Sequence, residues 1–271
     1  MKLHQFFTVF ILSIFLFACK NNNDKSPENR LREVSEEHKK VVFPIPTPYS
    51  VTNVLKEADA DFYEYLLNSI NNAEAYITLE KQGLNLGVYG TDLSYANVYG
   101  NSQLVNEYFS VIKYLTDELG FTELFNKEFL LRIQNNIDKP DSLFKIATES
   151  TYKTYEYLIN RGKGDLATIV LVGSWIEGLF LATQIGNLSE KPEVIWPEIA
   201  QQKFSSAILV EQLEKFKRSS NLVDDSYQNM KKLDMLLRQI KFKDDKPVYD
   251  AKLFNELSIS VAQIRSKIVN P

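Results

Sequence analysis

The sequence predicts an all-α protein, a multi-helix bundle of antiparallel α-hairpins. Apolar residues recur at spacings of three and four through most of the chain after residue 50, and the alternation typical of half-buried strands is nearly absent. Turn residues such as Gly162-Lys163-Gly164 interrupt this pattern. With 271 residues, 44% of them hydrophobic, the chain is long enough to bury a substantial core.

The periodic segments and the turn residues between them place the helices in order along the chain. We expect helices at 51–58, 61–69, 73–97, 101–119, 122–136, 141–161, 164–186, 193–218, 221–241 and 250–269. The stretch from Leu166 to Gly186 is apolar almost all round, with Glu177 as its one ionisable residue. Its length would allow a membrane span, but a carboxylate at mid-span would be costly, so we predict a central core helix.

The N-terminus carries a targeting signal. The apolar run from Phe6 to Phe17 is shorter than the roughly 20 residues that span a bilayer and is typical of a signal peptide. The residues Leu16-Phe17-Ala18-Cys19 resemble the lipobox of bacterial lipoproteins, although Phe17 stands where a small residue is usual. We therefore expect a signal peptide at 1–18 and a membrane anchor at a lipidated Cys19. The alternatives are an uncleaved anchor or an ordinary signal with a chance cysteine.

A polar tether and one folded domain follow the signal. Residues 19–48 are mostly polar and charged and end in the proline-rich FPIPTP, so they are predicted to form the lipidated Cys and a flexible linker. Residues 49–271 then form a single all-α domain. Cys19 is the only cysteine, so its lipidation would exclude both disulfides and thiolate catalysis.

Small residues form a stripe on the helix predicted at 73–97. Gly83, Gly87, Gly90 and Ser94 lie at intervals of four, three and four, which places them on one helix face. Glycine costs about 1 kcal/mol in a helix interior, so we expect a neighbouring helix to approach closely there. The pattern matches neither of the two glycine-rich phosphate-binding motifs, G-x-x-x-x-G-K-[S/T] and G-x-G-x-x-G. A similar stripe on the helix at 164–186 includes Gly178, and we predict a packing seam formed by Gly83, Gly87, Gly90, Gly173 and Gly178.

The two glycine-bearing segments resemble each other. Laying 87–96 on 173–182 aligns Gly87 with Gly173 and Tyr89 with Trp175, and a long amphipathic helix follows each segment. The bundle could therefore consist of two related halves packed face to face. A chance likeness is the alternative, and the residues alone leave both open.

Asp92 and Glu177 are the candidate functional side chains. Glu177 lies on an apolar helix, so its carboxylate should be desolvated, and Asp92 occupies the comparable part of the first hairpin. One interpretation is a pocket in which these weak catalytic candidates act as acid and base or bind a cation, with the ligand walls formed by Tyr89, Tyr95 and Trp175. The other is that each carboxylate has a structural partner. Tyrosine hydroxyls, helix-end amides, Arg132 and Lys153 are the candidates.

The predicted domain lacks the residues that several kinds of catalysis and metal binding require. The two histidines, His4 and His38, lie in the predicted signal and tether, so imidazole catalysis and His/Cys zinc sites are not expected. We expect no cofactor and no metal. The net charge of -4 and the lack of a basic cluster argue against nucleic acid as a partner.

The segments LNLGVYGTDLSYA and VGSWIEGLFLA, with the lipobox and FPIPTP before them, resemble an uncharacterised family of helical lipoproteins from Bacteroidota. The resemblance covers most of the mature chain and implies a location and a fold, without an activity. In that phylum surface-exposed lipoproteins often carry acidic residues after the cysteine. Here Lys20 and three asparagines follow, which favours an outer-membrane protein that faces the periplasm.

The sequence leaves three functional hypotheses open. The first is a lipid-anchored binding or scaffold protein without catalysis, which recognises an unknown protein or small molecule at the cleft between the glycine-bearing helices. The second is an enzyme that uses Asp92 and Glu177. The third is a purely structural protein of the cell envelope, which predicts neither a pocket nor a ligand.

Overall fold

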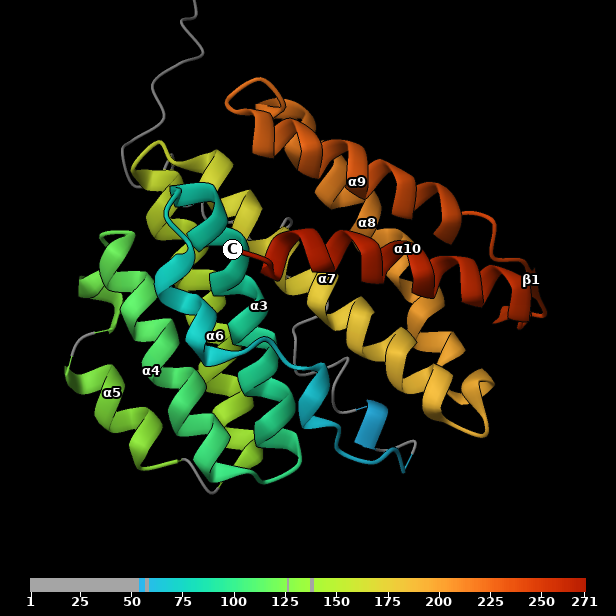
Figure 1. Ribbon diagram of the computed structural model, residues 1–271, viewed down its shortest axis with the longest axis horizontal. Coiled ribbons are helices and arrows are strands. Elements are labelled where there is room, and N and C mark those ends of the chain that lie inside the picture. The colour runs from blue at the N-terminus through green and yellow to red at the C-terminus, as the bar shows by residue number, and fades with distance from the viewer. Residues whose placement is uncertain (1–53, 57–58, 126, 137–138) are drawn as a thin grey trace, which may run out of the picture.

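The computed structural model describes residues 54–56, 59–125, 127–136 and 139–271. This part of the chain is all-α, as predicted (Figure 1). Its strands are the two-residue pair β1 (Phe242–Lys243) and β2 (Lys246–Pro247), which are antiparallel. The predicted signal peptide, Cys19 and the tether lie outside the described residues.

The helices follow one another through short turns. In chain order the 3-10 helices (η) and α-helices are η1 (Glu64–Leu66), η2 (Ile70–Ala75), α3 (Leu79–Val98), α4 (Ser102–Glu118), η3 (Thr122–Phe125), α5 (Lys127–Gln134), α6 (Pro140–Asn160), α7 (Gly164–Leu188), η4 (Pro192–Val194), α8 (Trp196–Phe216), α9 (Asn221–Leu237) and α10 (Ala251–Val269).

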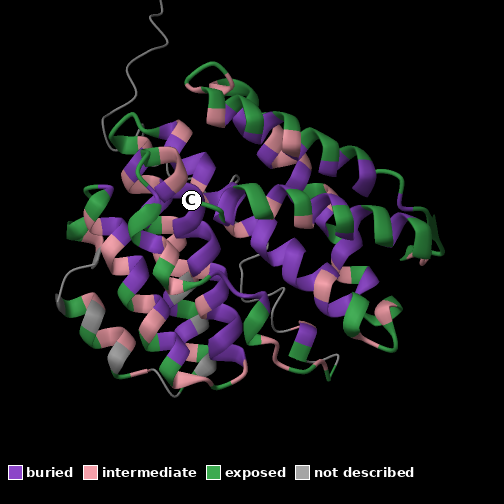
Figure 2. Ribbon diagram, viewed as in Figure 1, coloured by how far each residue is buried: buried purple, intermediate pink, exposed green. Residues whose placement is uncertain are grey.

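Helix α7 is the centre of the fold. It contacts α3 and α6 on one side and α8, α9 and α10 on the other. In Figure 1, α4 and α5 lie to the left, α8 and α9 to the upper right, and α7 runs between the two groups. By length and composition α7 could cross a bilayer, but 89% of its most apolar stretch is buried within the protein, as the colours of Figure 2 show. Here it is the core helix of the bundle.

Glycines allow α3 and α7 to cross at backbone distance. A Cβ added at Gly87 would overlap the carbonyl oxygen of Val170, and one added at Gly173 would overlap the carbonyl oxygen of Leu84. At Gly83 the Cβ would lie 2.6 Å from the Leu166 side chain. Gly87 and Gly173 therefore exclude any larger residue unless the two helices separate, whereas at Gly83 a shift of the Leu166 side chain could make room.

Gly90 does not share this close approach, although it lies on the same stripe. A Cβ added there would meet no neighbouring atom within 4 Å. The expectation that Gly90 packs against a helix is therefore wrong, because its face of α3 borders a cavity. Gly178 is buried within α7.

Residues 61–69, which periodicity predicts to be a helix, contain only the single turn η1. The hydroxyls of Tyr95, in α3, and Tyr99, just after it, form hydrogen bonds with the backbone of this segment instead. Tyr99 donates to the carbonyl of Ala60 at 2.7 Å, and the Tyr95 hydroxyl accepts from the amide of Tyr63 at 3.0 Å. Because these long-range bonds replace bonds within a helix, local periodicity could not reveal them.

Three other boundaries differ from the prediction. Helix α3 begins at Leu79, since the Thr78 side chain accepts from the Lys81 amide at 3.2 Å and caps the helix there. The helix expected at 122–136 is divided into η3 and α5. The chain after α9 turns through the β1–β2 hairpin, where Asp244 and Asp245 have φ of 49° and 59°, as in a type I′ turn.

Candidate functional site

The crossing of α3 and α7 brings Asp92 and Glu177 together. Both side chains are fully buried, and the two carboxyl groups lie close enough for the charge of Glu177 to raise the pKa of Asp92. Asp92 follows the close contact at Gly87 by five residues, and Glu177 follows Gly173 by four, so the glycine crossing sets their separation. The sequence places one carboxyl group on each helix, and the backbone contact makes them neighbours.

Arg265 of α10 is the partner of Glu177. Its Nε donates to Glu177 Oε2 at 2.9 Å and its Nη2 donates to Oε1 at 3.0 Å, so the ion pair is bidentate. Nη2 also donates to the carbonyl of Leu66 at 3.0 Å, and the guanidinium lies 4.6 Å from the ring centre of Phe180. Burial opposes the charge of Arg265, but the attraction of Glu177 raises the pKa of Arg265 overall.

Asp92 is the third member of this network. Its Oδ2 accepts from the backbone amide of Asn68 at 3.1 Å, while Oδ1 meets no donor among the described residues. Burial, and then the nearby Glu177 carboxylate, raise the pKa of Asp92 well above its ordinary value. With Asp92 protonated, the charges of Glu177 and Arg265 cancel and the three side chains carry no net charge.

Sequence reasoning missed Arg265 and named the wrong basic residues. Arg132 pairs instead with Glu149 at 2.7 Å. The signal for Arg265 lay in α10 itself, because Leu257, Val261 and Ile268 form a buried stripe and position 265 continues it at helical spacing. A cation on an apolar stripe indicates a buried anionic partner.

The aromatic residues expected as pocket walls are bonded to the protein. Tyr89 donates to the carbonyl of Ser69 at 2.8 Å, and Tyr95 is bonded to the 61–63 segment. Trp175 lies on another face of α7 and donates to Gln202 of α8 at 3.0 Å, so it faces away from the carboxylates.

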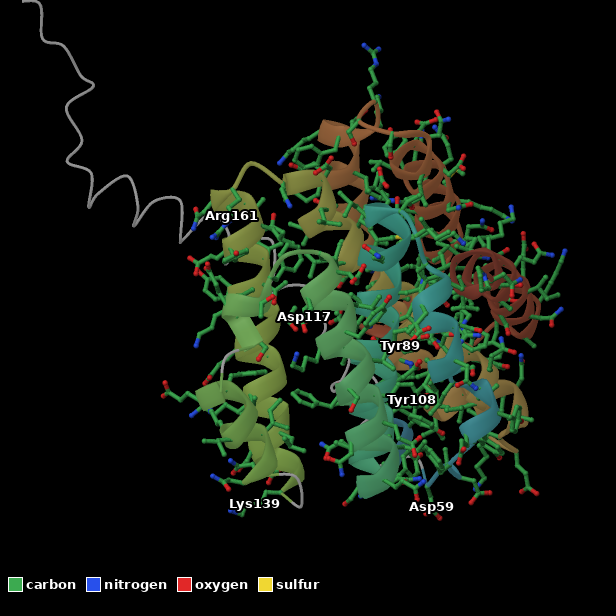
Figure 3. The ribbon with its side chains drawn as sticks, turned by 60° about the vertical axis from the view of Figure 1, so that its left-hand side comes forward. Asp59, Tyr89, Tyr108, Asp117, Lys139 and Arg161 are labelled. Atoms are coloured by element: carbon green, nitrogen blue, oxygen red, sulfur yellow. The ribbon has the colours of Figure 1, made fainter. Side chains whose placement is uncertain are left out.

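Tyr108, which the sequence did not single out, lies against Tyr89 instead (Figure 3). Its hydroxyl donates to the carbonyl of Asn68 at 3.0 Å, and Tyr76 donates to the carbonyl of Val269 at 2.8 Å. These bonds tie the 60–76 segment and the end of α10 to the core. The tyrosine hydroxyls around the carboxyl pair thus link segments that lie far apart in the sequence.

An apolar cavity lies on the other side of the α3–α7 crossing. Its volume is about 130 Å³, and α3, α4, α5, α6 and α7 all contribute to its wall. The wall is mostly aliphatic, with Leu86, Val105, Ile112, Ile146, Leu158 and Leu171 among its residues. Gly87, Gly90 and Ser174 line it from the glycine stripes. The carboxyl pair does not contribute to this wall.

A surface hollow of about 590 Å³ lies between the 62–70 segment and α4, with Glu64, Glu107 and Tyr108 in its wall. Asp92 and Glu177 do not line it either. Among the described residues no group of three His, Cys, Asp or Glu side chains is placed to hold a metal ion. What the carboxyl pair can do is hold α3, α7 and α10 in register, while the cavity can take an apolar molecule.

Comparison of this chain with protein families, with curated proteins and with solved structures finds no match.

Proposed function

We propose that this chain is a lipid-anchored cell-envelope protein that binds a small apolar ligand and catalyses no reaction. The observation that carries the proposal is the apolar cavity beside the α3–α7 crossing, about 130 Å³ in volume. An apolar cavity of about 150 Å³ engineered in another protein stays dry and takes up benzene or xenon. The ligand should therefore be of that size, or should insert an apolar group of that size.

The energetics of the cavity support a retained binding site. At about 24 cal/mol per Å³ for an enclosed cavity, an empty space of 130 Å³ costs at most on the order of 3 kcal/mol of stability. Gly90 adds about 1 kcal/mol of lost helix propensity at a position where no neighbour requires glycine. If the chain were selected for stability alone, one larger residue could recover both the stability lost to the cavity and the helix propensity lost at Gly90.

The carboxyl network argues against the enzyme alternative. The raised pKa of Asp92 is a feature that acid catalysis can use, so it is the one observation in favour of an enzyme built on Asp92 and Glu177. However, both residues are fully buried, Glu177 is neutralised by Arg265, and neither side chain borders the cavity. A structural role for this network, with ligand binding elsewhere, fits these contacts better.

The cellular location rests on the sequence. The signal at 1–18, the lipobox with Cys19 and the polar tether support attachment to the outer membrane through acyl chains, with the domain facing the periplasm. Cys19→Ser should release the mature protein into the soluble periplasmic fraction. Retention of a processed Cys19→Ser protein in the membrane would contradict the anchor.

Binding can be tested by calorimetric titration of the purified soluble domain with toluene. We expect saturable binding to the natural sequence and none to Gly90→Leu, whose side chain would enter the cavity. Ser110→Leu, which adds the same side chain at an exposed position of α4, is the matched control and should bind as the natural sequence does. Equal binding to both variants, or none to any, would contradict the proposed site. A purely structural protein predicts the last outcome.

A further inference from the structure

Two threonine hydroxyls at the cavity wall form no hydrogen bond with the described residues, and the one on Thr148 is fully buried. Thr148 and Thr154 of α6 both line the cavity. Thr148 Oγ1 is buried and has no hydrogen-bond partner among the described residues. Thr154 is 8% exposed, and its hydroxyl likewise forms no hydrogen bond with the described part of the chain.

This is unusual, because a serine or threonine in a helix can bond to the carbonyl four residues earlier. Ser150, between the two threonines, does so with the carbonyl of Ile146 at 2.6 Å, and Thr168 and Thr183 of α7 do so at 2.8 and 2.9 Å. Thr148 and Thr154 instead have no such bond among the described residues, at the wall of a cavity that is mostly apolar. Buried hydroxyls without a partner are costly, and a bound polar group would remove that cost.

Thr154 also marks the polar end of the cavity. A second cavity of about 170 Å³ adjoins it, and Phe129, Ser150 and Thr154 belong to both walls. The second cavity is lined in addition by Glu128, Arg132 and Lys153, so it is charged where the first one is apolar. A ligand with its apolar body beside Gly90 would therefore place a polar group toward Thr154 and the charged side.

We infer that the ligand is amphipathic, with a compact apolar body and one uncharged hydrogen-bonding group that Thr148 and Thr154 bind. This inference rests on the proposed function and names its ligand class. An uncharged group fits because the charged residues of the second cavity are of both signs, and because Arg132 is already paired with Glu149. Phenols and short alcohols with a ring or branched body belong to this class.

Phenol and toluene test the inference, because they differ by one polar group at nearly the same size. We expect the natural sequence to bind both ligands in calorimetric titrations. Thr148→Val combined with Thr154→Val removes both hydroxyls at nearly constant side-chain volume. The double variant should lose phenol affinity by roughly three- to tenfold and should keep its toluene affinity, since one neutral hydrogen bond is at stake. Thermal unfolding of the variant without ligand checks that it is folded.

The possible outcomes separate the inference from the proposed function. Binding of toluene but not phenol by the natural sequence would overturn the inference and leave the cavity site intact. The same holds if the double variant binds phenol unchanged, or loses phenol and toluene in equal measure. If the natural sequence binds neither probe, the proposed function itself fails. Selective loss of phenol affinity is the supporting result.

Discussion

Alanine at Gly90 and alanine at Gly87 should change stability in opposite directions. Both glycines lie inside α3, three residues apart, and alanine at either one recovers about 1 kcal/mol of helix propensity. At Gly90 the new methyl group enters open space, so we expect the full gain. At Gly87 it would overlap the carbonyl oxygen of Val170, a backbone atom that cannot turn aside.

The cost at Gly87 follows from this contact. Helices α3 and α7 would have to move apart along their longest interface, and overpacking of this kind costs about 1–3 kcal/mol or more after local relaxation. The same movement would strain the contact between Asp92 and Glu177. For a domain of this size about 1 kcal/mol corresponds to a change of roughly 2–4 °C in the unfolding midpoint. Gly90→Ala should therefore raise the midpoint by that amount, and Gly87→Ala should lower it by several degrees.

Thermal unfolding followed by circular dichroism at 222 nm measures both shifts, and urea unfolding gives the free energies. Gly173→Ala provides a second test, because its methyl group would overlap the carbonyl of Leu84. Two results would refute the reasoning. One is a loss of stability in Gly90→Ala that matches Gly87→Ala, which would mean that no open space adjoins Gly90. The other is a Gly87→Ala protein as stable as the natural one.

Further predictions concern the buried carboxyl network. Glu177→Gln leaves Arg265 buried without its counter-charge and should cost about 3–5 kcal/mol in urea unfolding, whereas Glu123→Gln, at an exposed pair with Arg161, should have little effect. Equal effects of the two variants would argue against the buried ion pair. Asp92→Asn tests the protonation of Asp92. Because its pKa is raised in the folded state, its contribution is complete below pH 4 and declines by up to about 1.4 kcal/mol per pH unit as pH rises toward the folded pKa. The amide can make the same hydrogen bonds without a proton to lose, so the natural protein should lose stability relative to Asp92→Asn over that pH range. A constant difference between the two proteins from pH 4 to pH 8 would mean that Asp92 titrates normally.

The sequence predicted those parts of the fold that depend on local periodicity. The long helices α4, α6, α7 and α10 have boundaries close to their apolar patterns, and α7 is the buried central helix that its composition indicates. Residues 60–69 show where the pattern misleads. Their helical spacing is real, but the tyrosine hydroxyls of Tyr95 and Tyr99 bind their backbone from 32 to 39 positions away. No local signal records such bonds.

Part of the candidate site could be predicted from the sequence. Burial of Glu177 follows from its apolar helix, and its position beside Asp92 depends on which helix the glycine stripe meets. The partner Arg265 comes from a helix 88 residues later in the chain, so only the interruption of an apolar stripe pointed to it. The cavity is harder still to predict, since an empty volume is set by how five helices fail to fill the space between them. Gly90 has the same sequence signal as Gly87, and only the packing separates their roles.

The central claim is that the cavity beside Gly90 holds an apolar ligand in the cell. Native mass spectrometry of the protein purified from its own envelope tests it most directly. We predict a stoichiometric adduct of one small molecule on the natural protein, absent from Gly90→Leu and retained in Ser110→Leu. A natural protein without any small-molecule adduct, or the same adduct on Gly90→Leu, would contradict the claim.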